Sequence, residues 1–184
     1  SSRTTEQDIQ PMTQHPARFE AYPTDRFIEI AKAWTERPWP MSPEEGRQVF
    51  EDLEYRADPS DPDMFSSPFS NGTPDSFFTA QDSIIDNVLI SVANRLTAPE
   101  DSDVIERTYL EYCEAIDSSF ASTITKLRTQ KKNTEWRFNN DVELSVGNAY
   151  ITVSLFIRSP RMAKLRLEEE AMGLTSYDEL LEDD

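Results

Sequence analysis

Hydrophobic and polar residues alternate most regularly in the stretch from Thr134 to Arg158. Apolar side chains recur there at every second position: Val142, Leu144, Val146, Ile151, Val153, Leu155 and Ile157. Asn139-Asn140-Asp141 and Gly147-Asn148 interrupt the alternation as turns. This period of two, rich in β-branched residues, is typical of an antiparallel meander with one buried face. We therefore expect three strands, over 134–138, 142–146 and 150–158.

Apolar residues at helical spacing predict four helices. The first begins near Thr24, a possible cap, and its inner face is Phe27, Ile30, Ala31 and Trp34. The second begins at the capping box Ser42-Pro43-Glu44-Glu45 and buries Val49, Phe50 and Leu53. The longest begins at Ser102-Asp103 and follows the stripe Ile105, Tyr109, Tyr112, Ile116 and Phe120. The sequence does not fix where this helix ends, and it can continue through Ile124 and Leu127. The last begins at Ser159-Pro160, is lined by Met162, Leu165 and Met172, and stops at Gly173.

The remaining segments complete an α+β prediction. Residues 76–80 and 87–93 have the composition of strands, whereas 58–75 is rich in Asp, Pro, Ser and Gly and predicts a long loop. Lys126 to Lys132 predict a basic connector. The expected fold is an antiparallel sheet of about five strands with helices packed on one face. The expected organisation is a flexible N-terminal arm (1–23), a single domain (24–175) and an acidic C-terminal tail (176–184).

Composition narrows the partners that this domain can bind. The chain has 35 acidic and 18 basic residues, a formal net charge of −17. Nucleic acids and anionic membranes both require a positive surface, so neither is an expected partner. A basic protein partner fits the charge, although acidity that serves only solubility is the simpler alternative. Cys113 is the single cysteine, and no apolar run is long enough for a membrane span, so we expect a soluble, cytoplasmic protein.

Candidate chemistry is sparse. The sequence contains no nucleophile elbow, zinc motif, C-x-x-C pair or glycine-rich phosphate loop, and His15 is its only histidine. Asp58, Asp61 and Asp63 loosely resemble a calcium loop, but the prolines between them, the missing glycine at the sixth position and the missing glutamate at the twelfth break the pattern. We therefore expect no enzyme, no cofactor and no metal site.

The chain resembles the small acidic immunity proteins that accompany bacterial polymorphic or contact-dependent toxins, in particular actinobacterial ones. The resemblance lies in Trp-Arg-Phe-Asn-Asn-Asp-Val-Glu-Leu-Ser-Val-Gly at 136–147, Ile-Thr-Val-Ser-Leu at 151–155, and Ser-Pro-Arg-Met-Ala at 159–163 with Glu168-Glu169-Glu170. It covers about the last third of the chain and the amphipathic start near 24–53. It implies an antidote that binds a toxin's active cleft, as a monomer in a 1:1 complex, without catalysis.

A second resemblance, to acidic secretion chaperones, rests on an α-β-β-α-β-β-α core order and the acidic charge. It implies a dimer that holds an extended segment of an exported client. The extra strand and the greater length count against it.

The antidote hypothesis singles out two contact regions. The predicted loop at 58–75 and the acidic helix face at 100–117 would meet basic groups of the toxin. The predicted partner-binding residues are Asp58, Asp61, Asp63, Glu111 and Glu114, with Trp39 and Phe65 as apolar anchors. The alternative for both aromatic residues is a place in the core.

Overall fold

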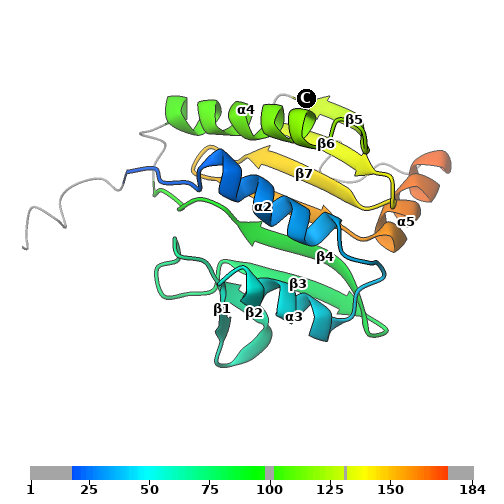
Figure 1. The fold of residues 1–184 in the computed structure, drawn as a ribbon, viewed down its shortest axis with the longest axis horizontal. Coiled ribbons are helices and arrows are strands. Elements are labelled where there is room, and N and C mark those ends of the chain that lie inside the picture. The colour runs from blue at the N-terminus through cyan, green and yellow to red at the C-terminus, as the bar shows by residue number, and fades with distance from the viewer. Residues whose placement is uncertain (1–17, 98–101, 131, 174–184) are drawn as a thin grey trace, which may run out of the picture.

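The computed structural model describes residues 18–97, 102–130 and 132–173 (Figure 1). Four helices lie in these ranges: α2 (Thr24–Thr35), α3 (Pro43–Asp52), α4 (Ser102–Ser119) and α5 (Pro160–Ala171). Eight strands accompany them: β1 (Arg56–Asp58), β2 (Asp61–Ser66), β3 (Ser76–Gln81), β4 (Ile84–Ser91), β5 (Ile124–Gln130), β6 (Asn133–Phe138), β7 (Glu143–Asn148) and β8 (Val153–Arg158). The α+β prediction is therefore confirmed.

All eight strands form one antiparallel sheet in the order β1-β2-β3-β4-β8-β7-β6-β5. Two four-stranded meanders, β1–β4 and β5–β8, are joined through their last strands, and a helix precedes each meander. The chain thus repeats a helix-plus-meander unit about an approximate two-fold axis between β4 and β8. The sequence gives no sign of this repeat, because the two units share topology and not residue pattern.

The core lies between the sheet and the layer formed by α2, α3 and α4 (Figure 1). Alternate strand residues such as Val88, Leu155 and Trp136 point into it and are fully buried. The central helix α2 packs on α4, where the rings of Phe27 and Tyr112 stack with centroids 3.8 Å apart. The alternation in the strands and the stripes in the helices therefore face one another, as the sequence predicts.

Local signals at the helix ends have the expected effect in two of three cases. The Ser42 hydroxyl accepts a hydrogen bond from the amide of Glu45, whose carboxylate accepts one from the amide of Ser42, so the capping box is confirmed. Ser159 caps α5 by accepting from the amide of Met162. Thr24, in contrast, lies inside α2, after Pro23, and caps nothing.

The sheet has eight strands where about five were predicted, and two segments are corrected. The segment 58–75 is a shorter loop than expected, because β1 and β2 form a hairpin before it. The basic connector at 126–132 contains most of the edge strand β5, and α4 ends at Ser119 without continuing to Leu127. Each missed strand lies toward an edge of the sheet, where burial on one face does not impose a hydrophobic alternation.

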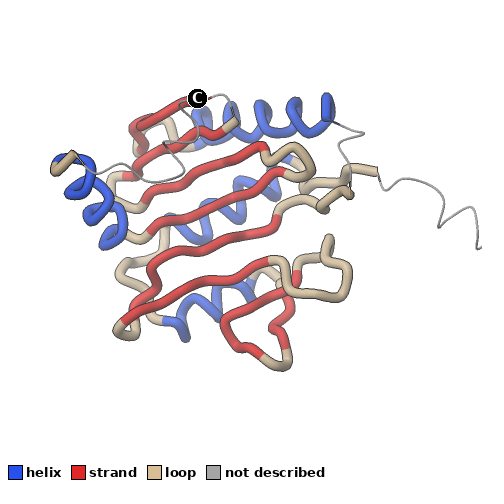
Figure 2. The backbone as a smooth tube through the Cα atoms, turned by 180° about the vertical axis from the view of Figure 1, so that it is seen from behind, coloured by secondary structure: helices blue, strands red, loops and turns tan. Residues whose placement is uncertain are grey.

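Helix α5 departs from the prediction that Met162, Leu165 and Met172 form its packed side. Ala163 is its only buried residue, and the Leu165 and Met172 side chains are exposed. The helix does not join the layer of α2, α3 and α4. Seen from behind, it lies beside the ends of the strands, and no described helix covers the middle of this second face of the sheet (Figure 2). We call this uncovered side the open face.

The described end of the predicted N-terminal arm is held against the sheet. Ala21 forms an antiparallel bridge with Ala93, and the Tyr22 amide donates to the carbonyl of Val92. The Tyr112 hydroxyl donates in turn to the carbonyl of Tyr22 at 2.5 Å. The rest of the predicted arm, with His15, and the predicted acidic tail at 176–184 lie outside the described residues.

Candidate binding surfaces

The three helices that cover the core present most of their charges to solvent, and most of those charges are acidic. Helices α2, α3 and α4 together contain eleven acidic and four basic residues. We call their outer surface the acidic helix layer. Carboxylates within a few helical turns of one another raise the local negative potential, which favours the approach of a cationic partner.

The outer side of α4 combines carboxylates with an exposed apolar side chain. Glu111 and Glu114 are both exposed, as the sequence analysis expects for contact residues. Leu110 beside them is 54% exposed and adds apolar area to this side of the helix. Asp117, one turn further on, is already occupied, because it accepts from Trp136 Nε1 and from Lys126 Nζ at 2.9 Å each.

The aspartates of the predicted loop at 58–75 already accept hydrogen bonds or form an ion pair, and they lie away from α4. Asp58 accepts hydrogen bonds from Ser60, and Asp63 pairs with Arg47 of α3 at 2.9 Å. Asp61 accepts from the amide of Asp63 at the same hairpin. This hairpin lies at the β1 edge of the sheet, whereas α4 covers β7 and β8, so the structure does not bring the two predicted regions together (Figure 1).

The two predicted aromatic anchors pack within the domain. Phe65 is completely buried, and its ring stacks on Phe50 with centroids 4.4 Å apart. Trp39 is partly buried against the core and donates from Nε1 to the carbonyl of Trp34. The Phe65 ring is therefore inaccessible to a partner in this conformation. The core position named as the alternative describes Phe65, whereas Trp39 lies partly buried at the margin of the core.

The open face is organised in rows that cross the sheet. One row follows the paired residues Met64, Phe77, Leu89, Phe156, Ser145, Glu135 and Arg128 from β2 to β5. Its first four members are partly buried and apolar, and the last three are polar. Along this row the open face is therefore apolar from β2 to β8 and polar from β7 to β5.

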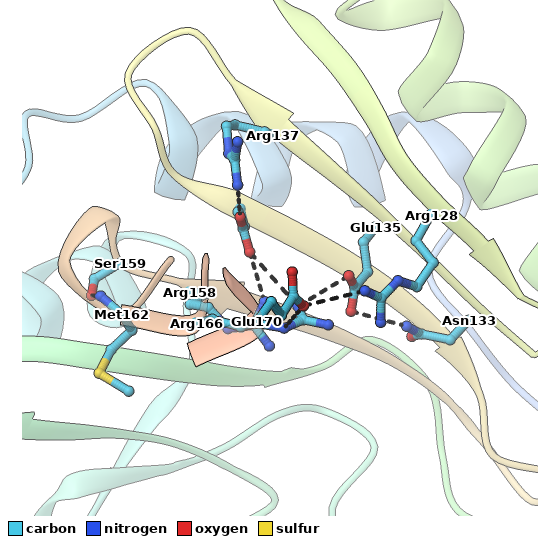
Figure 3. A network of polar contacts seen from close by, with 10 residues as sticks. Arg128, Asn133, Glu135, Arg137, Arg158, Ser159, Met162, Arg166 and Glu170 are labelled. Carbon is cyan, nitrogen blue, oxygen red and sulfur yellow. Dashed lines mark hydrogen bonds and ion pairs between the residues drawn. The ribbon is translucent and has the colours of Figure 1, made fainter. Parts of the chain in front are cut away.

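The charged half is a network of arginines around two buried carboxylates (Figure 3). Glu143, which is 3% exposed, accepts from Arg137 at 2.6 Å and from Arg158 at 2.8 Å. Glu135 accepts from Arg166 of α5 at 3.0 Å, and Glu170 of α5 pairs with Arg128 at 3.3 Å. These contacts hold α5 against the open face. Because each buried carboxylate has an arginine partner, the network resembles a structural clamp more than a reactive site.

The apolar half ends in a groove of about 510 Å³ at one end of the central strands. Met64, Phe77 and Leu89 contribute its apolar floor. The loop 67–75 forms one wall, and the segment 93–97 with the start of β8 forms the other. This groove has the size of ligand sites in general and lies on the side of the sheet opposite the acidic helix layer.

Sequence reasoning missed the open face and its groove. The missed residues are Met64, Phe77, Leu89, Phe156 and Arg95, which come from distant segments. One signal was available: Phe156 and Leu89 are large apolar residues at the positions of their strands that should face solvent. The pairing register of β4 and β8 places Leu89 beside Phe156.

In the part of the chain that the structure describes, no three His, Cys, Asp or Glu side chains converge as a metal site would require. None of the described helices has the length and apolar character that crossing a membrane demands. The Cys113 thiol is partly buried against the core, and burial raises its pKa.

Comparison with known proteins gives one match. The model of a family of unknown function, DUF6301, matches residues 25–159, which include every described element except α5 and part of α2. No curated protein and no solved structure matches the chain.

Proposed function

The chain belongs to the DUF6301 family, and we propose that it is a non-catalytic binding protein that holds a basic partner protein against its acidic helix layer. The observation that carries the proposal is the charge of this layer, eleven acidic residues against four basic ones on a single side of the domain. Such a surface accelerates association with a cationic partner and orients it.

The centre of the proposed contact is the outer side of α4. Leu110 supplies exposed apolar area, and Glu111 and Glu114 lie beside it. An apolar contact inside a charged rim is the usual composition of a binding hot spot. The resemblance to immunity proteins supplies the class of partner, a secreted toxin whose basic cleft the acidic layer would occlude.

The protein acts as a monomer in this proposal. Both halves of the sheet are already present in one chain, and its two edges offer little for pairing with a second copy. Edge strand β1 has three residues, and edge strand β5 carries Lys126 and Arg128. Short edges and charged edges both oppose sheet extension. These edges count against the dimer that the second resemblance implies.

The test is inhibition of a partner. Proteins captured from the native source are identified and then produced in a bacterial host, with and without this chain. We expect one of them to be toxic alone and harmless when coexpressed, and the purified complex to have 1:1 mass. A captured partner that is equally toxic in both cases would contradict the proposed function.

The contact surface is tested with matched charge reversals. Glu111→Lys with Glu114→Lys should weaken binding at least tenfold, mainly through slower association that depends less on salt. Glu168→Lys with Glu169→Lys changes the net charge equally on the exposed side of α5 and should leave binding within about twofold. Equal effects of the two pairs would show that only net charge matters and not the outer side of α4.

A further inference from the structure

We propose that the groove on the open face is a second binding site, which takes an extended segment of a partner protein that presents one large apolar side chain followed closely by a carboxylate. The proposal goes beyond the function assigned to the acidic helix layer and rests on different residues.

The shape of the groove favours a polypeptide segment. Its floor of Met64, Phe77 and Leu89 continues along the same row to Phe156, so the apolar surface extends beyond the cavity itself. Apolar surface that continues along a row of paired strand residues suits an extended chain, whereas a compact small molecule would occupy the cavity alone.

The charges at the groove select the carboxylate. Two charged residues line it, Arg95 and Asp75. Asp75 is already satisfied, because its two oxygens accept from the amide and hydroxyl of Ser67 at 2.8 and 2.5 Å. Arg95 is exposed and has no ion-pair partner among the described residues. Among the described residues the groove therefore offers an apolar floor and one cation without an ion pair, and a guanidinium matches a carboxylate with two parallel hydrogen bonds.

The loop that forms the wall is held in place. The contacts of Asp75 with Ser67 close its neck, and the ring of Phe69 packs edge-on against Tyr22 at 4.9 Å between centroids. The hydroxyl of Ser67 also accepts from the Phe69 amide. A wall fixed in this way costs little further ordering when a segment binds.

The experiment uses the full chain and a fluorescent peptide of about ten residues, rich in Gly and Ser, with one Phe and a Glu two positions after it. We expect saturable binding in fluorescence anisotropy. Replacing the peptide's Phe with Ala should weaken binding at least about tenfold, since a buried aromatic side chain contributes more than 1.4 kcal/mol. Replacing its Glu with Gln should weaken binding severalfold.

Protein variants locate the site. Arg95→Glu should weaken binding of the Glu peptide about tenfold and leave the Gln peptide less affected. Arg107→Glu, the same charge change on the exposed side of α4, is the matched control and should leave binding within about twofold. Both substituted residues are exposed, so neither change threatens folding, and the urea midpoint of each variant checks this.

Three results would overturn the proposal. They are the absence of saturable binding, binding that Arg95→Glu leaves unchanged, and binding that appears only after residues 174–184 are deleted. The last result would identify the chain's own C-terminal segment, Leu180-Leu181-Glu182 included, as the occupant in place of a partner.

Discussion

The two sides of this sheet share the same strands and hydrogen bonds but differ in what lies over them. On the helix side, alternate residues such as Leu155 and Trp136 are completely buried under three helices. On the open face, their neighbour Phe156 lies opposite Ser145 in the sheet, and Glu135 pairs with Arg166 of α5. The backbone hydrogen bonds of the sheet are the same whether or not helices cover a face. The covering layer therefore decides which side chains each face can carry.

The two sides of the sheet also differ in whether their carboxylates have ion-pair partners. Glu143 is buried on the open face and has two arginine partners, whereas Glu111 and Glu114 on the helix layer are exposed and have no ion pair with the described residues. A carboxylate removed from water needs a cation or hydrogen bonds, and a solvated one does not. The buried charge of Glu143 therefore holds the open face together, whereas Glu111 and Glu114 have no such ion pair with the described residues.

The two sides of the sheet should differ most in the unfolding free energy that is lost when an apolar side chain is truncated. Leu155→Ala should lower the free energy of unfolding by about 3 kcal/mol, because it leaves a cavity in the core. Phe156→Ala, on the next residue of the same strand, should cost about 1 kcal/mol, because its ring is only partly buried. Urea unfolding followed by circular dichroism measures both. Equal losses would mean that the open face is as well packed as the core.

The network on the open face should show an intermediate effect. Glu143→Gln removes the charge that Arg137 and Arg158 share and should cost about 2 kcal/mol in unfolding free energy. Glu168→Gln on the exposed side of α5 is the control and should change it by less than about 0.5 kcal/mol. If the two variants were equally stable, the arginines would not depend on Glu143.

The close packing of α3 on the sheet predicts a smaller loss of stability for a substitution at Gly46. A Cβ atom on Gly46 of α3 would lie 2.3 Å from Ile85 Cδ1 and 3.4 Å from Phe78. Gly46→Ala should therefore destabilise the protein by about 1 kcal/mol, although alanine is otherwise the better helix residue. Adding Ile85→Val removes the clashing methyl and should recover part of the loss in a double-mutant cycle. A stabilising Gly46→Ala would contradict the close approach.

The smallest effect concerns pH. Burial raises the pKa of Tyr109 to about 12, and burial also raises the pKa of Tyr112 and Tyr55. The unfolded chain ionises its tyrosines from about pH 10, so the stability that these phenols provide is full below pH 10 and falls as the pH rises toward 12. Tyr109→Phe should make this alkaline decline shallower, as measured by thermal melts from pH 8 to 11. An unchanged slope would mean that the phenol is solvated.

The predicted binding residues show how far sequence reasoning extends. It identifies Glu111 and Glu114 as an exposed acidic pair, because the apolar stripe of α4 fixes which side faces out. It cannot tell that Phe65 belongs to β2 and points into the core, because Pro62 and the aspartates around it suggest a loop. A short strand such as β2 is stabilised by the strands on either side of it, and those neighbours are not visible in the local pattern.

The sequence by itself determines the central strands, the helices that cover them, two of the helix caps and the acidic character of the surface. Each of these depends on residues within a few positions of one another, through hydrophobic period, capping and charge. Only the tertiary structure decides the joining of two meanders through β4 and β8, the uncovered face and the groove beside Arg95. These features bring together residues far apart in the chain, such as Met64, Leu89 and Phe156, and no local interaction encodes their adjacency.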